Sequence, residues 1–167
     1  MRIVTIGVYG FTAETFLAQL TGAGVGLVLD VRQRRGVRGT QYSWANSVRL
    51  QRMLGAAGVG YRHVKGLAPT TELRQLQYRA DDRQGVGKRN RVALAPEYTA
   101  GYTREILDPF DLGALVTELP RDVVTAVLCV ERDAAACHRS LVVARLHTEH
   151  GLPVTDLHPG LHSNTVA

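Results

Sequence analysis

Runs of apolar residues separated by amphipathic segments dominate the chain and predict alternating strands and helices. The run from Val123 to Val130 is apolar at nearly every position, as in a strand that is buried on both faces of a parallel sheet. Four shorter segments have a similar character: Arg2 to Val8, Val25 to Val31, Tyr61 to Val64 and Val154 to Leu157. We therefore expect a sheet of about five strands.

Amphipathic segments with recognisable caps lie between these strands. Thr12 and Asn46 each precede such a segment, and both residue types are favoured before a helix. The predicted helices cover 13–20, the segment between Asn46 and Gly58, Thr71 to Tyr78, Pro96 to Ile106, 112–119 and the segment after Cys137. Strand–helix–strand units of this length pair in parallel with right-handed crossovers. The sequence thus predicts one three-layer, Rossmann-like α/β domain over residues 1–159, with a mainly parallel sheet, helices on both faces and a loose tail over 160–167.

The composition is that of a small globular protein of a reducing compartment. A chain of 167 residues can bury a sizeable core as one domain. It has no run of about 18 apolar residues and no signal-peptide pattern, so we expect a cytoplasmic protein with no membrane partner. Two cysteines, Cys129 and Cys137, are too few for a disulfide framework. No cofactor is expected, and the oligomeric state is left open.

Positive charge is concentrated in the middle of the chain. The net charge is +5, but residues 32–91 hold fourteen basic and three acidic residues, whereas the remainder holds six basic and twelve acidic ones. Eighteen of the twenty basic residues are arginine, whose planar guanidinium suits bidentate contacts with phosphate. This distribution predicts an anionic partner, either a nucleotide or a nucleic acid.

Polar side chains stand at the carboxyl ends of two predicted strands. Asp30 and Arg32 end one strand, and Cys129 and Glu131 end another. The carboxyl ends of parallel strands meet at one edge of an open sheet, where ligands bind, so we expect these residues to share a site. The loop 33–39, rich in arginine and glycine, follows the first of these strands and should border the site.

The residues around this loop suit a phosphate-bearing ligand. The predicted anion-binding residues are Arg32, Arg35, Arg38 and Arg139, and the predicted base-stacking residues are Tyr42 and Trp44. For either ring alone, packing of the loop onto the domain explains its presence equally well.

A Cys-His-Arg sequence opens the helix that follows the longest apolar run. Unpaired backbone N–H groups at a helix start favour anions and thiolates. We predict that a carboxylate activates water and that a histidine supplies a proton. The predicted catalytic residues are Asp30, Glu131, His138 and Cys137.

Several of these motifs resemble one family. Leu29-Asp30-Val31-Arg32, Gly58-Val59-Gly60-Tyr61, Leu128-Cys129-Val130-Glu131 and Cys137-His138-Arg139 are similar to the family catalogued as domain of unknown function 488, a group of small bacterial and archaeal α/β proteins. The resemblance implies a fold and a site but no activity. Members usually begin Thr-Ile-Gly-His-Ser, whereas Val8 and Tyr9 replace the last two residues here.

The favoured hypothesis is a protein that binds or processes a phosphate-bearing nucleotide or nucleic acid at the carboxyl edge of the sheet. Whether it is an enzyme is open, and a hydrolase, assisted by a carboxylate and a His-Arg pair, is the expected class. A non-catalytic anion-binding module is one alternative. In a purely structural alternative, Asp30 and Glu131 neutralise the arginines and fix the loops.

Two further alternatives use the cysteines. A thiol-dependent enzyme would use Cys137 or Cys129, in a layout similar to rhodanese-like sulfurtransferases and low-molecular-weight phosphatases, although nine residues separate Cys129 from Arg139. A metal site would combine Cys129, Cys137 and His138 with His158 or Glu131 as the fourth ligand. That spacing matches no ordinary zinc module, so no metal is predicted.

Overall fold

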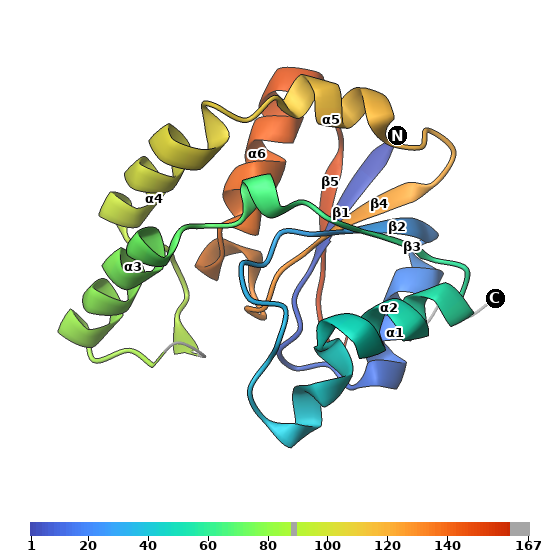
Figure 1. The fold of residues 1–167 in the computed structure, drawn as a ribbon, viewed down its shortest axis with the longest axis horizontal. Coiled ribbons are helices and arrows are strands. Elements are labelled where there is room, and N and C mark those ends of the chain that lie inside the picture. Colours follow the sequence, from blue (N-terminus) through green and yellow to red (C-terminus); the bar gives the residue numbers. More distant parts are fainter. Residues whose placement is uncertain (88–89, 161–167) are drawn as a thin grey trace.

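A five-stranded parallel sheet forms the centre of the protein, as the sequence predicts. The computed structural model describes residues 1–87 and 90–160. The strands are β1 (Arg2–Ile6), β2 (Val25–Asp30), β3 (Gly60–His63), β4 (Val124–Leu128) and β5 (Val154–Leu157). Their order across the sheet is β3-β2-β4-β1-β5, and every pairing is parallel. The α/β fold with five parallel strands is therefore confirmed (Figure 1).

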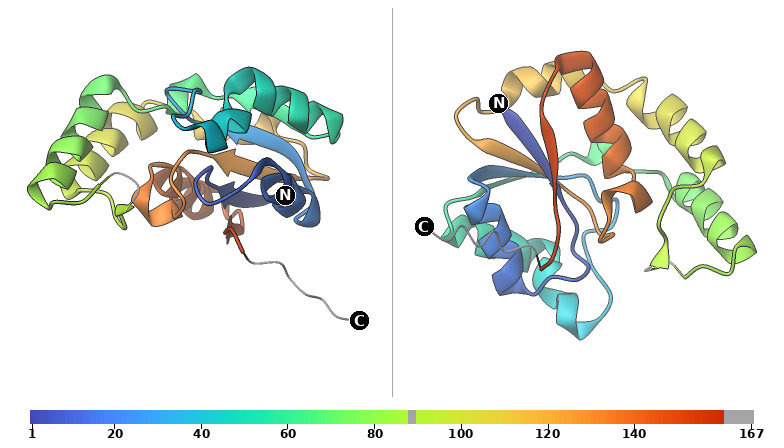
Figure 2. Two further views of the ribbon diagram at one scale, coloured as in Figure 1. Left: turned by 90° about the horizontal axis from the view of Figure 1, so that it is seen from below. Right: turned by 180° about the vertical axis from the view of Figure 1, so that it is seen from behind.

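Helices cover both faces of this sheet, which gives the predicted three layers. They are α1 (Ala13–Gly22), α2 (Ser47–Ala56), α3 (Thr71–Arg83), α4 (Pro96–Tyr102), α5 (Leu112–Glu118) and α6 (Arg139–His150). Two apolar clusters fill the interior, one beneath α1 and α2 and the other beneath the remaining four helices. The paired helices α3 and α4 stand away from the sheet beyond α6, on the left in Figure 1 and in the left view of Figure 2.

The register places the carboxyl ends of the central strands level with one another. Leu128 is paired with Ile6 on one side and with Asp30 on the other, and Asp30 is paired with His63. Strands β1 and β4 end two residues before the predicted Val8 and Val130. The backbone contacts nevertheless continue beyond the strands, because the Cys129 amide donates to the Ile6 carbonyl (3.2 Å).

Local sequence explains the helix starts that frame the site. The Thr12 hydroxyl accepts from the Thr15 amide (3.2 Å) at the start of α1, and the Thr70 hydroxyl accepts from the Leu73 amide (3.2 Å) at the start of α3. The helix predicted from Pro96 to Ile106 is α4 followed by a π-helical turn, Thr103–Leu107. Within residues 1–87 and 90–160, no helix is long and apolar enough to cross a membrane. Apart from Gly160, the predicted tail 160–167 lies outside the described residues.

Candidate functional site

A cavity of about 450 Å³ opens at the carboxyl edge of the sheet. One wall is the loop after β2, and the opposite wall is formed by α3 and by residues of the segment between Arg91 and Tyr98. Its floor consists of residues 129–131, which follow β4, and residues 136–138, which precede α6. The cavity therefore lies where open α/β sheets bind ligands.

Cys129, Cys137 and His138 meet at the floor of this cavity. The Nδ1 atom of His138 lies 3.8 Å from Sγ of Cys129 and also 3.8 Å from Sγ of Cys137. The Nε2 atom on the other side of the ring lies 3.0 Å from the carbonyl oxygen of Val31. A carbonyl only accepts hydrogen bonds, so Nε2 carries a hydrogen. Nδ1 is the ring nitrogen nearer to both sulfurs, and Sγ of Cys129 also lies 4.0 Å from Nε2.

The loop between β4 and α6 folds back so that its end meets its beginning. A short 3-10 helix, Ala134–Ala136, turns the chain, and the Cys137 amide donates to the Ala134 carbonyl (2.9 Å). The Ser140 hydroxyl donates to the Cys137 carbonyl (2.8 Å) at the start of α6. Cys137 and His138 are thereby placed beside Cys129, which lies eight and nine residues earlier in the chain. Residues at both ends of the loop between β4 and α6 therefore line the cavity floor.

The buried floor favours a thiolate at Cys137. Burial alone would raise the pKa of Cys137, but a hydrogen bond from Cys129 and the charges of His138 and Arg139 lower that pKa well below its usual range. Burial and the same hydrogen bond raise the pKa of Cys129. Burial would lower the pKa of His138, whereas the charge of Cys137 and the bond to Val31 raise it. These shifts make Cys137, rather than Cys129, the cysteine that loses its proton more readily.

Glu131 also lines the cavity, held near a buried arginine. Its Oε1 atom lies 3.7 Å from Nη1 of Arg91, and Arg91 also forms an ion pair with Asp81. The same Nη1 atom donates to the Ala136 carbonyl (3.4 Å). Sequence reasoning missed Arg91, whose only signal was its place in the basic segment 32–91. In the structure Arg91 ties the chain after α3 to the cavity floor through Ala136.

Asp30 and Arg32 are bonded mainly to each other. Asp30 accepts bonds from the Arg32 amide (3.0 Å), from Nε (2.9 Å) and Nη2 (2.7 Å) of the Arg32 guanidinium, and from the Tyr61 hydroxyl (2.7 Å). Nη1 of Arg32 donates to the Ala45 carbonyl (2.9 Å). Arg32 lines the cavity, whereas Asp30 is fully buried and does not. These contacts are the ones that the structural alternative expects, and a catalytic role of Asp30 stays a prediction.

Arg139 points away from the cavity and holds its own loop. Nη1 donates to the Glu131 carbonyl (2.7 Å), and Nη2 donates to the Arg132 carbonyl (3.0 Å). Its side chain is 1% exposed and is not among the residues that line the cavity. The structure therefore places Arg139 as a support for the floor, next to Cys137 and His138 in sequence.

The other predicted ligand-binding residues divide between the cavity and its surroundings. Arg38 lines the cavity, whereas Arg35 lines a second, shallower hollow with Arg49 and Arg52. The ring of Tyr42 packs on Tyr9 (5.1 Å between centroids), and the ring of Trp44 packs on Phe16 (4.8 Å). Neither Tyr42 nor Trp44 lines the cavity. The aromatic residues that do line it are Tyr9, Tyr78 and Tyr98, none of which the sequence analysis proposed as a stacking platform.

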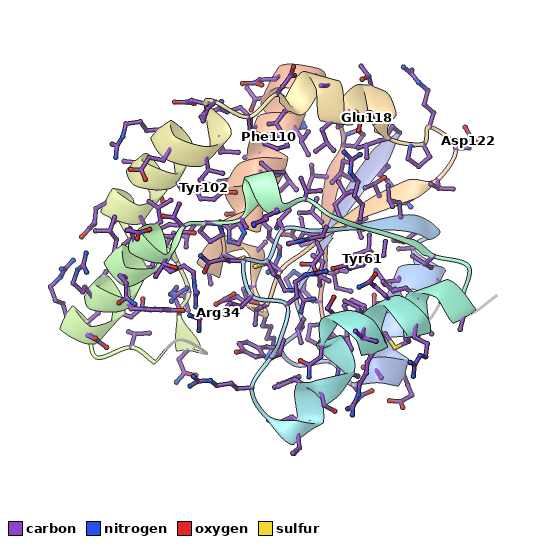
Figure 3. The ribbon with its side chains drawn as sticks, viewed as in Figure 1. Arg34, Tyr61, Tyr102, Phe110, Glu118 and Asp122 are labelled. Carbon is purple, nitrogen blue, oxygen red and sulfur yellow. The ribbon has the colours of Figure 1, made fainter. Side chains whose placement is uncertain are left out.

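Three arginines of the cavity wall have no acidic partner among the described residues: Arg34, Arg38 and Arg74. Arg34 and Arg38 are exposed. Arg74 donates to the Gln33 side chain and to the Tyr78 hydroxyl (2.7 Å), both of which are neutral. Figure 3 shows Arg34 between α3 and the loop after β2. Arg34 belongs to the predicted loop 33–39 but not to the predicted anion-binding residues. Arg74 is missing from them because nothing in the sequence shows which way α3 faces.

Comparison with known proteins identifies the family and nothing more specific. Neither the search of curated proteins nor the search of solved structures gave a match. The family model described as "Domain of unknown function DUF488" matches residues 12–146, which include β2, β4, the cavity floor and most of α6. This chain therefore belongs to the DUF488 family.

Proposed function

We propose that this protein binds a phosphate-bearing nucleotide, or a phosphate of a nucleic-acid strand, in the cavity at the carboxyl edge of the sheet. The observation that carries the proposal is the group of three arginines, Arg34, Arg38 and Arg74, on the cavity wall without acidic partners among the described residues. Guanidinium groups that are not neutralised by carboxylates are suited to bidentate phosphate contacts.

The rest of the cavity fits such a ligand in size and in chemistry. A volume of about 450 Å³ is within the usual range of small-molecule sites. The partly exposed rings of Tyr9 and Tyr78 supply apolar surface on which a base can stack. The guanidinium of Arg74 lies 5.5 Å from the ring centroid of Tyr78, so α3 carries a phosphate-binding group and a ring surface side by side.

Hydrolysis is the reaction that we propose for this site. Glu131 is the only acidic residue among the described residues that line the cavity. A carboxylate at this place can accept a proton from the water that attacks the substrate. The loop carbonyls of Glu131 and Arg132 are fixed by Arg139, which limits the movement of the carboxylate (Nη1 to the Glu131 carbonyl, 2.7 Å).

The proposal is tested by fluorescence anisotropy with a labelled single-stranded oligonucleotide, and by competition with an unlabelled mononucleotide. The double variant Arg34→Ala, Arg38→Ala should bind at least about tenfold more weakly, because it loses charge-assisted hydrogen bonds. The matched control is Arg62→Ala, Arg104→Ala, which removes two positive charges that are paired with Glu118 and Glu105 away from the cavity.

The outcomes separate the ligand classes. If an unlabelled mononucleotide competes as well as an unlabelled oligonucleotide, the cavity is assigned to nucleotides. If only the oligonucleotide competes, the cavity is assigned to a strand. Binding should weaken between low and moderate salt, because phosphate contacts release counterions. Equal losses in the cavity variant and the control variant would contradict the proposal.

A thiol-dependent reaction is the second candidate, because the Sγ atom of Cys137 lies on the cavity floor 3.8 Å from Nδ1 of His138. This arrangement of a thiol and a base is typical of activated cysteine nucleophiles. Cys137→Ser should then abolish turnover of a chromogenic phosphate ester while leaving anion affinity unchanged. Full turnover by Cys137→Ser would remove this candidate.

A further inference from the structure

We propose that Cys129, Cys137 and His138 bind a zinc ion on the floor of the cavity. The three donor atoms, Sγ, Sγ and Nδ1, all lie within 4.8 Å of one another. Each sulfur is 3.8 Å from Nδ1. In a tetrahedral zinc site with Zn–S of about 2.3 Å and Zn–N of about 2.1 Å, a sulfur and a nitrogen ligand are about 3.6 Å apart. Both sulfur–nitrogen distances exceed this value by only a few tenths of an ångström, whereas Sγ of Cys129, which also lies 4.0 Å from Nε2, has to shift further toward the Nδ1 side of the ring.

The second nitrogen of His138 supports a ligand role. Nε2 donates to the Val31 carbonyl at 3.0 Å, which holds the ring and leaves Nδ1 as the nitrogen available to an ion. Histidines that bind metals almost always donate their other ring N–H to a carbonyl or a carboxylate in this way. The Val31 carbonyl belongs to the segment just after β2, so the sheet itself orients the ring.

Adjacent residues can reach one ion here because the backbone changes conformation between them. Cys137 is extended (φ −143°, ψ 144°), whereas His138 is already helical (φ −57°, ψ −19°). This change brings the two neighbouring side chains to the same place. These two adjacent residues can therefore reach one ion, although the spacing of the whole set matches no ordinary zinc module.

The ligand set selects the metal class. Two cysteine sulfurs and one imidazole nitrogen suit zinc and other late transition metals, not magnesium or calcium. All three residues line the cavity, so a fourth position is available to water or to a substrate oxygen. Three protein ligands with one open position is the pattern of catalytic zinc sites. His158 lies 3.8 Å from Asp133 and does not line the cavity, so it is not the fourth ligand.

The zinc proposal does not depend on the proposed function. Only a role of the ion in hydrolysis rests on that function. Glu131 lines the same cavity, and zinc lowers the pKa of a bound water. A bound ion would also occupy the Cys137 sulfur that a nucleophile needs. The zinc site and the thiol-dependent candidate are therefore mutually exclusive.

The test uses the full chain, purified without a histidine tag, loaded with zinc and dialysed against metal-free buffer. We expect one zinc ion per chain by elemental analysis. Cobalt(II) in place of zinc should give a thiolate-to-cobalt charge-transfer band and the strong visible absorption of a tetrahedral site. Cys137→Ser and His138→Gln should lose both signals, and His158→Ala, the matched control, should keep them.

The test separates loss of zinc from misfolding and from loss of nucleotide binding. Because a cysteine variant could fail to fold, the cobalt spectrum of the unchanged chain decides the matter by itself. Folded protein that retains no zinc, or whose cobalt spectrum lacks the thiolate band, would overturn the proposal. Loss of nucleotide binding in the arginine variants has no effect on these readouts, so the two proposals fail independently.

Discussion

The Nε2 atom of His138 lies 3.0 Å from the carbonyl oxygen of Val31, which joins the start of α6 to the end of β2. The amide of Val31 donates in turn to the carbonyl of Leu128 (3.1 Å), the last residue of β4. One histidine thus connects the helix that carries the cavity floor to the two central strands. The position of the floor depends on this buried contact.

His138→Ala should lower the free energy of unfolding by about 1–3 kcal/mol, because it leaves the buried Val31 carbonyl without its donor. Chemical unfolding in urea measures the change. His150→Ala, at the other end of α6, is the control and should cost little. A loss no larger than that of the control would show that the contact with Val31 does not stabilise the protein.

Gly7→Ala should destabilise the protein strongly. A Cβ atom on Gly7 would lie 1.9 Å from the Glu131 carbonyl oxygen, the same oxygen that accepts from Arg139. The loop that carries Glu131 would have to move. Gly55→Ala is the matched control, because Gly55 lies within α2 with nothing within 4 Å of the added atom.

Gly55→Ala should itself stabilise the protein by about 0.5–1 kcal/mol, since alanine is the better helix former. Thermal unfolding of the two variants should therefore shift in opposite directions. Equal transition temperatures would mean that β1 and the 131–132 loop do not pack as closely as the structure shows.

Asp30→Asn should cost about 3 kcal/mol or more in unfolding free energy, because it breaks a buried ion pair and leaves Arg32 charged. The control is Asp122→Asn, in the exposed loop before β4 (Figure 3). Urea unfolding gives the stability, and anisotropy gives ligand affinity. A stable Asp30→Asn protein that has lost only turnover would instead support the catalytic role predicted from the sequence.

The fold was predictable because its signals are local. Continuous apolar runs marked the strands, and a capping residue such as Thr12 marked the start of α1. The meeting of Cys129, Glu131 and His138 at one edge also followed, since parallel strands end together. Strands and helix starts can be recognised from neighbouring residues alone, without knowing how distant segments pack.

The remaining wall of the cavity was not predictable, because it depends on contacts between distant segments. Arg74 and Tyr78 face the cavity only because α3 packs on α4, where Leu73 lies close to Gly101. Arg139, which is predicted to bind an anion, shows the same limit. Its sequence position beside His138 could not show that its guanidinium binds the carbonyls of its own loop.

A crystal structure of the protein soaked with a mononucleotide tests the central claim most directly. We expect the phosphate group inside the cavity, within hydrogen-bond distance of at least two of Arg34, Arg38 and Arg74. A phosphate bound only in the second hollow, beside Arg35, Arg49 and Arg52, or a cavity that stays without ligand at saturating nucleotide, would contradict it.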